Sequence, residues 1–239
     1  TDSDIYLLLA RAAAQKGDLD EARHILSQGN QANPGSVSLL NFIAAVSARA
    51  GRHDESEAAL KKCIELEPVQ TAHRFRLAEL WWQTGKKDQA VRMIDGLIGQ
   101  AGKAEQVRID SAAFYQSHND LTHAEQVLKD GLEHMPDSYK LHFALSDVYM
   151  RNFMPLKAAG VLRQSLAIEA DCDRPEVLQA KNILARALMT QGGLTEAEEL
   201  VEAVLSESSG NIEARYIKAR LLMLRKNAAE AISEFRTVV

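Results

Sequence analysis

The sequence predicts an all-α chain folded as an α-solenoid of antiparallel helical hairpins. Strong helix formers dominate the composition, whereas aromatic residues make up 5% of it and Pro occurs 5 times. A pattern of residues recurs with a period of 34. Each copy carries two small residues at a fixed spacing, where the backbones of two helices can approach closely. The 239 residues are 46% hydrophobic, which is enough for a buried core.

The period is visible in the strings that open the second helix of a hairpin. GDLDEARHIL recurs as GRHDESEAAL, GKKDQAVRMI, NDLTHAEQVL, GGLTEAEELV and KNAAEAISEF. One small residue in each copy marks the register: Ala22, Ser56, Ala90, Ala124, Ala158, Ala197 and Ala231. Successive intervals are 34, 34, 34, 34, 39 and 34 residues. A period of this length indicates stacked supersecondary units.

Two further positions follow the same register. Twelve residues before each of the first set lies another small residue: Ala10, Ala44, Ala78, Ala112, Ser146, Ala185 and Ala219. Four residues after the first set comes a bulky apolar residue: Leu26, Leu60, Ile94, Leu128, Leu162, Val201 and Phe235. We expect the small pair to let two antiparallel helices pack closely, and the large residue to fill the groove between them.

Glycine and proline divide the chain into hairpins. We expect repeats at 3–36, 37–70, 71–104, 105–138, 139–177, 178–211 and 212–239. The first helix of a hairpin should end at a glycine, the usual residue of a left-handed C-terminal cap: Gly17, Gly51, Gly85 and Gly192. Second helices should close at Pro34, Pro68 and Pro136, which share one phase of the repeat.

Two departures from this pattern affect the local shape. Phe153 replaces the glycine between helices and is followed by Pro155, which can still begin a helix. The interval of 39 residues places an insertion near 171–175. Asp173 and Glu176 have the spacing of a capping box, so we expect the first helix of the sixth repeat to begin about one turn early. The alternative is a slightly longer loop.

The arrangement resembles the tetratricopeptide repeat family. Its hairpin of 34 residues has small residues at the eighth and twentieth positions and Pro at the thirty-second, as this chain has from Ser3 to Val239. The resemblance implies a right-handed α-solenoid, with a single superhelix of about seven repeats over residues 1–239, as in bacterial tandem arrays.

The resemblance also implies a binding surface. In this family, positions five, nine and twelve of each repeat line the concave groove. We predict a ligand-binding stripe from these positions: Phe75, Glu79, Trp82, Phe143, Asp147, Met150, Asn182, Arg186, Met189, Tyr216, Arg220 and Met223. The alternative is that some of these side chains, the methionines above all, fold into the core between repeats. Some members hold a chaperone C-terminus with Lys at position five and Asn at position nine, and no repeat here has that pair.

Little in the sequence points to catalysis or to a metal. The net charge of −5 argues against a nucleic-acid partner, and phosphate-loop, nucleotide-binding and hydrolase motifs do not occur. Cys63 occupies a core position of its repeat, and His118 and His123 fall at a turn and early in a helix. The cluster 171–173 lacks the ligands of a calcium loop and is expected to be a polar connector. We therefore expect no enzyme activity, no cofactor and no metal.

The sequence carries no signal for membrane insertion. Its most apolar stretch, from Ile5 to Ala14, is interrupted by Arg11 and is too short to cross a bilayer. We expect a soluble chain of the cytoplasm or the periplasm.

These observations favour a non-catalytic scaffold or adaptor that binds a peptide or helical segment of another protein in the concave groove. Bacterial arrays of this style often serve envelope, secretion or exopolysaccharide assembly. One alternative is a structural scaffold that self-associates through the solenoid ends, and another is the non-catalytic arm of an enzyme such as a glycosyltransferase. Because Phe235 and Val238 line a face with no helix after it, we also expect either a longer protein or pairing of this end with a second copy.

Overall fold

The computed structural model describes residues 2–102, 104–168 and 174–237. Over these ranges the chain forms fourteen helices and no strand. The predicted all-α array of antiparallel hairpins is confirmed, since every hairpin pairs a first and a second helix in close contact. The expected connector at 171–173, the capping role of Asp173 and the C-terminal Val238 lie outside the described residues.

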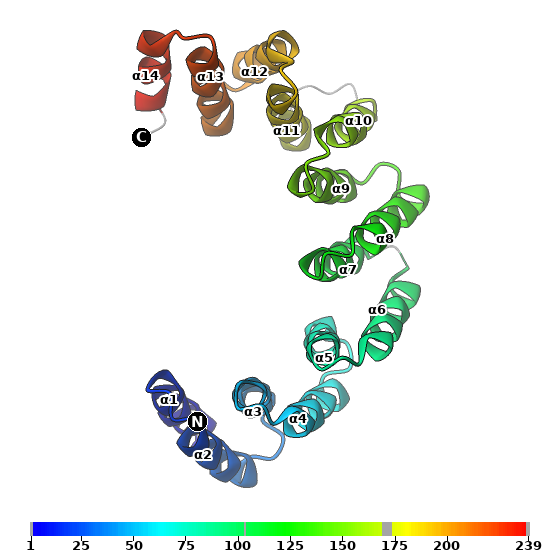
Figure 1. Cartoon of the computed structure of the whole chain (residues 1–239), viewed down its shortest axis with the longest axis vertical. Coiled ribbons are helices and arrows are strands. Elements are labelled where there is room, and N and C mark those ends of the chain that lie inside the picture. The colour runs from blue at the N-terminus through cyan, green and yellow to red at the C-terminus, as the bar shows by residue number, and fades with distance from the viewer. Residues whose placement is uncertain (1, 103, 169–173, 238–239) are drawn as a thin grey trace. The chain divides into compact units, whose positions relative to one another are not determined.

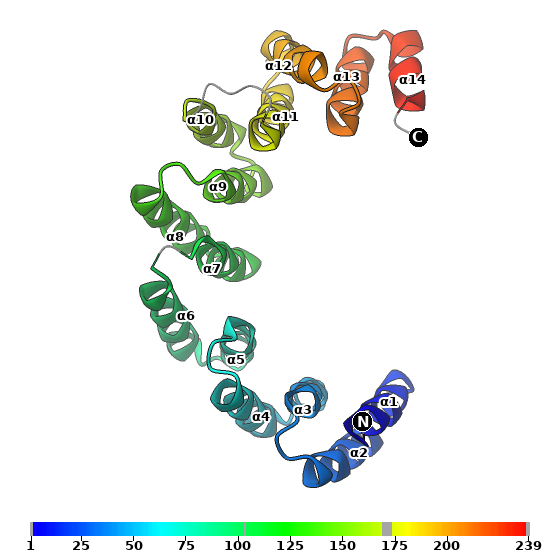
Figure 2. The ribbon, with the colours of Figure 1, turned by 180° about the vertical axis from the view of Figure 1, so that it is seen from behind.

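The chain divides into two compact units, residues 1–102 and 103–239. The helices of the first unit, labelled in Figure 1, are α1 Asp2–Gln15, α2 Leu19–Ala32, α3 Val37–Arg49, α4 His53–Leu66, α5 Thr71–Gln83 and α6 Lys87–Ala101. Each odd-numbered helix pairs with the even-numbered helix that follows it, as Figure 2 shows from behind. The prediction that residues 1–239 form a single superhelix stays a prediction.

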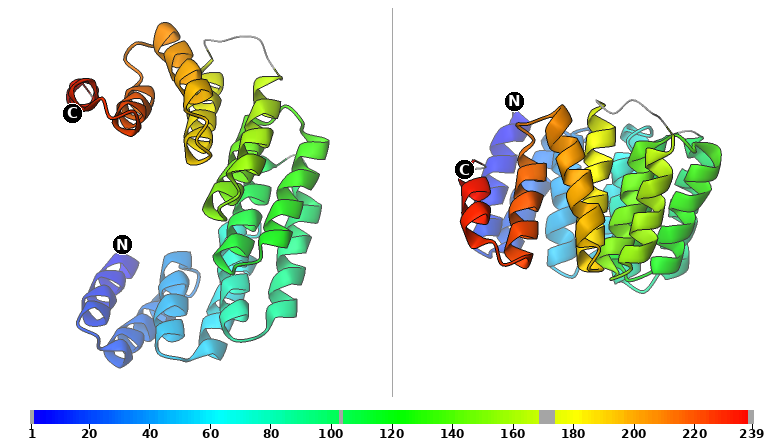
Figure 3. Two further views of the ribbon diagram at one scale, coloured as in Figure 1. Left: turned by 45° about the horizontal axis from the view of Figure 1, so that its top comes forward. Right: turned by 90° about the horizontal axis from the view of Figure 1, so that it is seen from above.

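The second unit repeats this arrangement. Its helices are α7 Glu105–Ser117, α8 Leu121–His134, α9 Tyr139–Arg151, α10 Pro155–Leu166, α11 Pro175–Thr190, α12 Leu194–Glu207, α13 Ile212–Leu224 and α14 Ala228–Arg236. Figure 3 shows the members of a hairpin side by side, as for α7 and α8 in green. No helix of the described ranges is both long enough and apolar enough to cross a membrane.

Close packing within each hairpin depends on the small residues. All fourteen predicted small positions are buried, with at most 4% of the residue exposed. At Ser56 the side chain makes a direct link to the other small position, because its hydroxyl donates a hydrogen bond of 2.8 Å to the carbonyl oxygen of Ala44. The bulky apolar residue four positions after the second small residue is also buried in six hairpins, from Leu26 to Val201, and Phe235 is half-buried.

Glycine serves a related purpose between hairpins. A Cβ atom at Gly29 in α2 would lie 2.8 Å from the Cβ of Tyr6 in α1 and 3.2 Å from a methyl carbon of Leu39 in α3. A Cβ at Gly131 in α8 would meet Leu141 in α9 at 3.0 Å. Around these two glycines, neighbouring hairpins of the same unit therefore stack with their helices in direct contact. Cys63 occupies the same repeat position and is fully buried, which confirms its predicted place in the core. Burial raises the pKa of its thiol.

The turn inside each hairpin requires one residue with positive φ. The four predicted glycines have φ between 73° and 86°. The equivalent residues in the other hairpins are not glycine: Asn119, Phe153 and Lys226 have φ of 59°, 57° and 63°. Asn tolerates this left-handed region, whereas a bulky side chain such as that of Phe153 is strained in it.

Helix α11 differs from the other first helices in where it begins. It starts at Pro175, the first helical residue, with Arg174 as the N-cap. The early start expected from the insertion is therefore present. Proline suits this position because the first turn of a helix leaves its N–H groups without intrahelical partners. The side chain of Arg174 makes no capping hydrogen bond to the helix.

Ion pairs connect successive hairpins along their second helices. Arg23 of α2 lies 3.0 Å from Glu55 of α4, and Arg163 of α10 lies 2.8 Å from Glu196 of α12. Glu57 of α4 lies 2.7 Å from Lys61 and 2.8 Å from Lys86, the N-cap residue of α6. These contacts hold neighbouring repeats in register at the surface, where an isolated pair adds little stability.

Ala124→Leu should force α7 and α8 apart, because the Ala124 side chain is fully buried where the two helices meet. We expect the free energy of unfolding to fall by about 1–3 kcal/mol, as is typical of overpacked cores. Gln116→Leu, at a half-buried position in the same hairpin, is the control. Equal tolerance of both changes in chemical denaturation would mean that the assigned register of the repeat is wrong.

Phe153→Gly should stabilise the second unit. Phe153 is 94% exposed, so its removal loses almost no buried area, and glycine relieves the left-handed backbone strain. We expect a gain of about 0.5–1 kcal/mol in thermal or chemical unfolding. Asn119→Gly should gain less, because asparagine already accommodates this conformation. A lower melting temperature for Phe153→Gly would refute the strain argument.

Glu57→Gln should change the pH dependence of stability. Hydrogen bonds from Lys61 and then Lys86 lower the pKa of Glu57 from 4.5 to about 2. A lowered folded-state pKa contributes stability above pH 4.5 that is lost as the pH falls toward 2. The variant should therefore be less stable than the parent at pH 7, and the difference should shrink below pH 4.5. Glu65→Gln removes another carboxylate at an exposed site on α4 and is the control. A difference independent of pH would contradict the assignment.

Candidate binding surface

The first helices of the first unit enclose a groove. A cavity of about 590 Å³ lies among α1, α3 and α5, with part of α4 at its base. Six of its lining residues occupy the predicted stripe positions five, nine and twelve: Leu7, Arg11, Asn41, Ala45, Ala48 and Glu79. We refer to this cavity as the first-helix groove.

Small residues keep the groove open, and apolar residues form much of its surface. Ala45 and Ala48 lie on consecutive turns of α3, and each contributes only a methyl group. Leu7 of α1, Leu60 of α4 and Leu80 of α5 add larger apolar surfaces. A concave surface of this kind can bury an apolar side chain of a bound segment.

The charges of the groove are positive on balance. Arg11, Arg76 and Glu79 all line it. Arg76 donates a hydrogen bond of 2.7 Å to the amide oxygen of Asn41, and the Arg11 guanidinium carbon lies 6.0 Å from the centre of the Phe42 ring. Within the described parts of the chain neither arginine forms an ion pair. Two cations are therefore available to a negatively charged ligand group.

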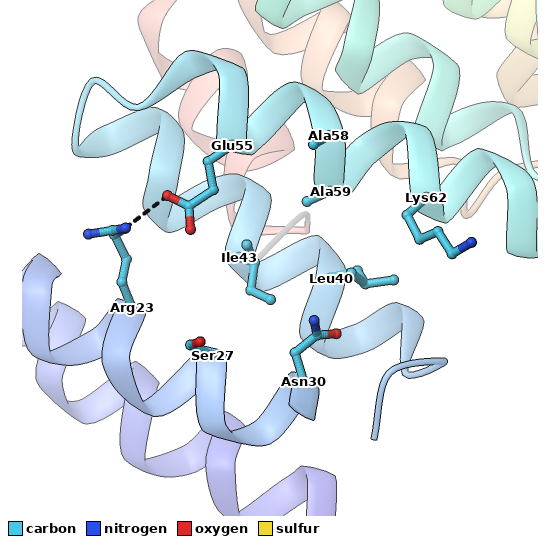
Figure 4. Close-up of a pocket in the computed structure, with 9 residues that line it drawn as sticks. All are labelled: Arg23, Ser27, Asn30, Leu40, Ile43, Glu55, Ala58, Ala59 and Lys62. Atoms are coloured by element: carbon cyan, nitrogen blue, oxygen red, sulfur yellow. Dashed lines mark hydrogen bonds and ion pairs between the residues drawn. The ribbon is translucent and has the colours of Figure 1, made fainter. Parts of the chain in front are cut away.

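A second cavity lies between hairpins on the side of the second helices. Figure 4 shows its lining, with Arg23, Ser27 and Asn30 on α2 facing α4. Its volume is about 290 Å³, roughly half that of the first-helix groove. The ion pair between Arg23 and Glu55 spans one side of it, so this cation is already neutralised. The first-helix groove is accordingly the better candidate for a ligand.

The predicted stripe residues of the first unit are only partly brought together. Glu79 lines the groove, where its carboxylate accepts a hydrogen bond of 2.7 Å from Gln83. Phe75 and Trp82 lie half-buried on the same helix but are not among the lining residues. The ammonium group of Lys87 lies 5.1 Å from the centre of the Trp82 ring, a cation–π distance.

Two predicted stripe residues of the second unit are buried, and the prediction that they lie on an open surface is wrong. Asn182 is 1% exposed and donates a hydrogen bond of 3.2 Å to Asn211, the N-cap of α13. Met189 is 9% exposed. The reason is the position of α11, which contacts α9, α10, α12 and α13 and has little free surface. Met189 therefore lies in the core, which was the alternative considered for the methionines.

Other predicted stripe residues of the second unit are at least partly accessible, but two of the charged ones form ion pairs within the chain. Arg186 lies 3.1 Å from Glu213, and Asp147 lies 2.7 Å from Arg151. Phe143 and Met150 are half-buried on α9.

Helix α13 carries the most accessible part of the stripe. Tyr216 and Met223 are 46% and 52% exposed, and Arg220 between them is also exposed. The Arg220 guanidinium lies 6.0 Å from the centre of the Tyr216 ring, which also packs edge-on against Phe235.

Helical phase explains what the sequence prediction missed. Arg76 occupies position six of its repeat, and Ser38 and Phe42 occupy positions two and six of theirs, yet all three line the groove. Positions two, six and nine recur at spacings of four and three, so they share one face of a helix. This spacing is visible in the sequence, but positions five, nine and twelve by themselves do not include positions two and six.

The histidines singled out in the sequence lie in structural contacts. Among the described residues there is no group of three or more side chains suited to holding a metal ion. His123 contacts the Asp120 carboxylate at 2.7 Å and stacks on the Tyr115 ring. The His118 ring packs edge-on against Phe114. Both histidines thus have ordinary structural contacts at the start of α8 and in the turn before it.

Comparison with known families finds repeat models that match much of the chain. Family models described as Tetratricopeptide repeat match residues 3–35, 43–105, 157–212 and 183–239. The chain belongs to the tetratricopeptide repeat family. The tetratricopeptide fold is typical of non-catalytic protein-interaction scaffolds with protein or peptide partners.

Solved structures share the fold. A tetratricopeptide repeat protein from Parabacteroides merdae is 14% identical, with 99% of this chain and 92% of that chain covered and a TM-score of 0.52. The C-terminal part of a TPR repeat-containing protein from Cytophaga hutchinsonii is 12% identical, with 96% and 92% covered and a TM-score of 0.54. At this level of identity the likeness concerns the fold alone.

One curated relative is similar in sequence. The cellulose synthase operon protein C of Pseudomonas fluorescens is 24% identical over an alignment of 187 residues, and the match covers 75% of this chain. The match covers 14% of the relative, so this tetratricopeptide chain spans a small part of that protein's length.

Proposed function

We propose that this chain is a non-catalytic scaffold that binds a peptide or helical segment of another protein in the first-helix groove. The observation that supports this is the cavity of about 590 Å³ that combines apolar walls with Arg11 and Arg76. Neither arginine has a carboxylate partner among the described residues. A groove with these properties suits a segment that presents apolar side chains and at least one carboxylate.

The expected affinity is modest. Three or four buried apolar anchors contribute about 6–10 kcal/mol before other terms, at roughly 1.5–3 kcal/mol each. Ordering a flexible segment opposes binding by about 2–5 kcal/mol. We therefore propose a micromolar or weaker complex for a short peptide. The second unit offers a separate proposed contact surface in the accessible residues of α13: Tyr216, Arg220 and Met223.

We further propose that the scaffold serves assembly of an exopolysaccharide or another part of the bacterial envelope. The likeness to the cellulose synthase operon protein C supports this setting. The same likeness, over only 14% of that protein, also favours the related proposal that these repeats act as the non-catalytic arm of a larger assembly or enzyme.

Arg76→Glu should weaken partner binding without loss of helix content. Arg76 is exposed and lines the groove, so its reversal places a negative charge where the proposed ligand is negative. We expect a loss of about tenfold or more at low salt, and a smaller loss as salt screens the charges. Partners captured by the intact chain from a bacterial lysate can be identified by mass spectrometry, and their segments titrated calorimetrically.

Arg92→Glu is the matched control, because Arg92 is exposed on α6 and does not line the groove. Ala48→Trp tests the same site by filling the cavity. Equal binding by the parent, Arg76→Glu and Ala48→Trp proteins would rule out the first-helix groove. Selective loss with Tyr216→Ala and Met223→Ala would instead place the site on α13.

A further inference from the structure

The turn between α9 and α10 exposes apolar side chains that the fold does not use. Phe153 and Leu156 are 94% and 75% exposed. Phe153 also has a φ of 57°, a left-handed conformation that is unfavourable for a bulky side chain. Described hairpins of the same unit precede and follow this turn, so neighbouring repeats leave it uncovered. Strained residues of this kind cluster at binding sites.

A cavity of about 580 Å³ lies beside the same helix. It opens between α8 and α10, the second helices of neighbouring hairpins labelled in Figure 1, and α9 packs against both of them. Its apolar lining comes from all three helices: Leu132 of α8, Leu145 and Tyr149 of α9, and Val161 of α10. The cavity is about as large as the first-helix groove but belongs to the second unit.

Gly160 gives an outside chain close access to this cavity. It is an exposed residue in the middle of α10 and lines the cavity, and a Cβ atom there would meet nothing from a neighbouring side chain or helix within 4 Å. Glycine weakens a helix interior relative to alanine. Helices packed against Gly29 and Gly131 explain those glycines, whereas no described part of the chain lies against Gly160. Gly96 of α6 is also exposed in this way, but only Gly160 of the two lines this cavity.

The exposed apolar residues and the cavity form one continuous surface. Leu156, Gly160 and Gln164 follow one another at intervals of four residues, so they lie along one stripe of α10. Gly160 and Gln164 line the cavity, and Leu156 extends the stripe by one turn toward Phe153. We refer to the cavity together with Phe153 and Leu156 as the α8–α10 surface.

The shape of the α8–α10 surface suits a helix. Its sides are two helices, and the lining residues of α10, from Lys157 to Gln164, span about two turns. The missing side chain at Gly160 lets a third helix lie against α10, as small residues let helices approach inside each hairpin. An amphipathic helix docks on such a groove with apolar residues at spacings of three and four.

Charges favour a protein segment over a lipid surface. Lys129 and Lys157 contact the Glu125 carboxylate at 2.5 and 3.5 Å, and Arg151 next to the turn is paired as well. These cations are already partnered, which weakens any attraction to an anionic membrane. Glu133 of α8 lines the cavity and forms no ion pair in the ranges that the structure describes. A basic side chain on a bound helix can pair with it.

We propose that an amphipathic helix of a partner protein docks on the α8–α10 surface, with its apolar side chains over the cavity and Phe153 and a basic side chain beside Glu133. This site goes beyond the proposed first-helix groove, because it is formed by other helices in the other unit. The chain then has two independent sites for protein segments.

Photo-crosslinking from the turn identifies the occupant. The full chain with p-benzoylphenylalanine in place of Phe153 keeps an exposed aromatic side chain there, and irradiation in a bacterial lysate links it to whatever lies against it. Mass spectrometry identifies the linked segment, which is then synthesised and used as the probe. We expect a segment with apolar residues at helical spacing that becomes helical by circular dichroism when the chain is added.

Two variants separate binding from folding. Gly160→Leu places a side chain in the cavity and raises helix propensity, and Phe153→Gly removes the exposed ring and relieves the left-handed strain. Each should raise the melting temperature and yet weaken the probe peptide by about tenfold or more in calorimetric titration. Weaker binding by a protein more stable than the parent does not come from unfolding.

Gly96→Leu is the matched control, since Gly96 is an exposed helical glycine outside this cavity. It should bind the probe peptide as the parent does. Glu133→Lys should weaken the peptide at low salt and less so at high salt, because it repels the basic side chain. Arg76→Glu, in the first-helix groove, should leave this peptide unaffected, so failure of one site is distinguishable from failure of the other.

Four results would overturn the proposal. One is no linked segment above the level obtained with the crosslinker at Val69, which is 90% exposed in the first unit. A second is a peptide that binds without becoming helical, or equally well to the parent and to Gly160→Leu. A third is a crosslink between two copies of this chain. The fourth is binding to vesicles of phosphatidylethanolamine and phosphatidylglycerol that Phe153→Gly abolishes.

Discussion

Close approach of two helix backbones at a pair of small residues is the constraint on which the rest of this structure depends. At Ala44 and Ser56 the approach is close enough for a side-chain hydroxyl to bond to the backbone of the neighbouring helix at 2.8 Å. Small residues are buried at both positions in every hairpin, so the two helices of each repeat pack in the same register. That register determines which side chains lie between the two helices and which lie outside them.

The proposed binding surface depends on this packing, but its details come from local deviations from the repeat. In the first unit, alanines at two successive stripe positions of α3 leave room for a cavity beside Arg11 and Arg76. In the second unit, α11 is surrounded by four other helices, and its stripe residues Asn182 and Met189 are buried. The same repeat positions therefore line a groove on α3 and are buried on α11.

Backbone strain and uncovered surface mark the places where the repeat is imperfect. Phe153 adopts a left-handed conformation at a position that glycine occupies in four other hairpins, and its ring is exposed. Packing inside the hairpin does not require a phenylalanine at this turn.

The sequence alone determined the fold class, the repeat register and the burial of residues such as Ala124 and Cys63, because close helix packing imposes a strict spacing of small and large side chains. Helix boundaries could also be predicted from single residues. Gly17 marks the turn after α1 and Pro175 the start of α11, because both positions restrict φ. Only the tertiary structure decided that Arg76 faces the groove, that Glu213 neutralises Arg186 and that Asn182 is buried. Those outcomes depend on distances between neighbouring repeats, and a periodic pattern within one repeat does not specify them.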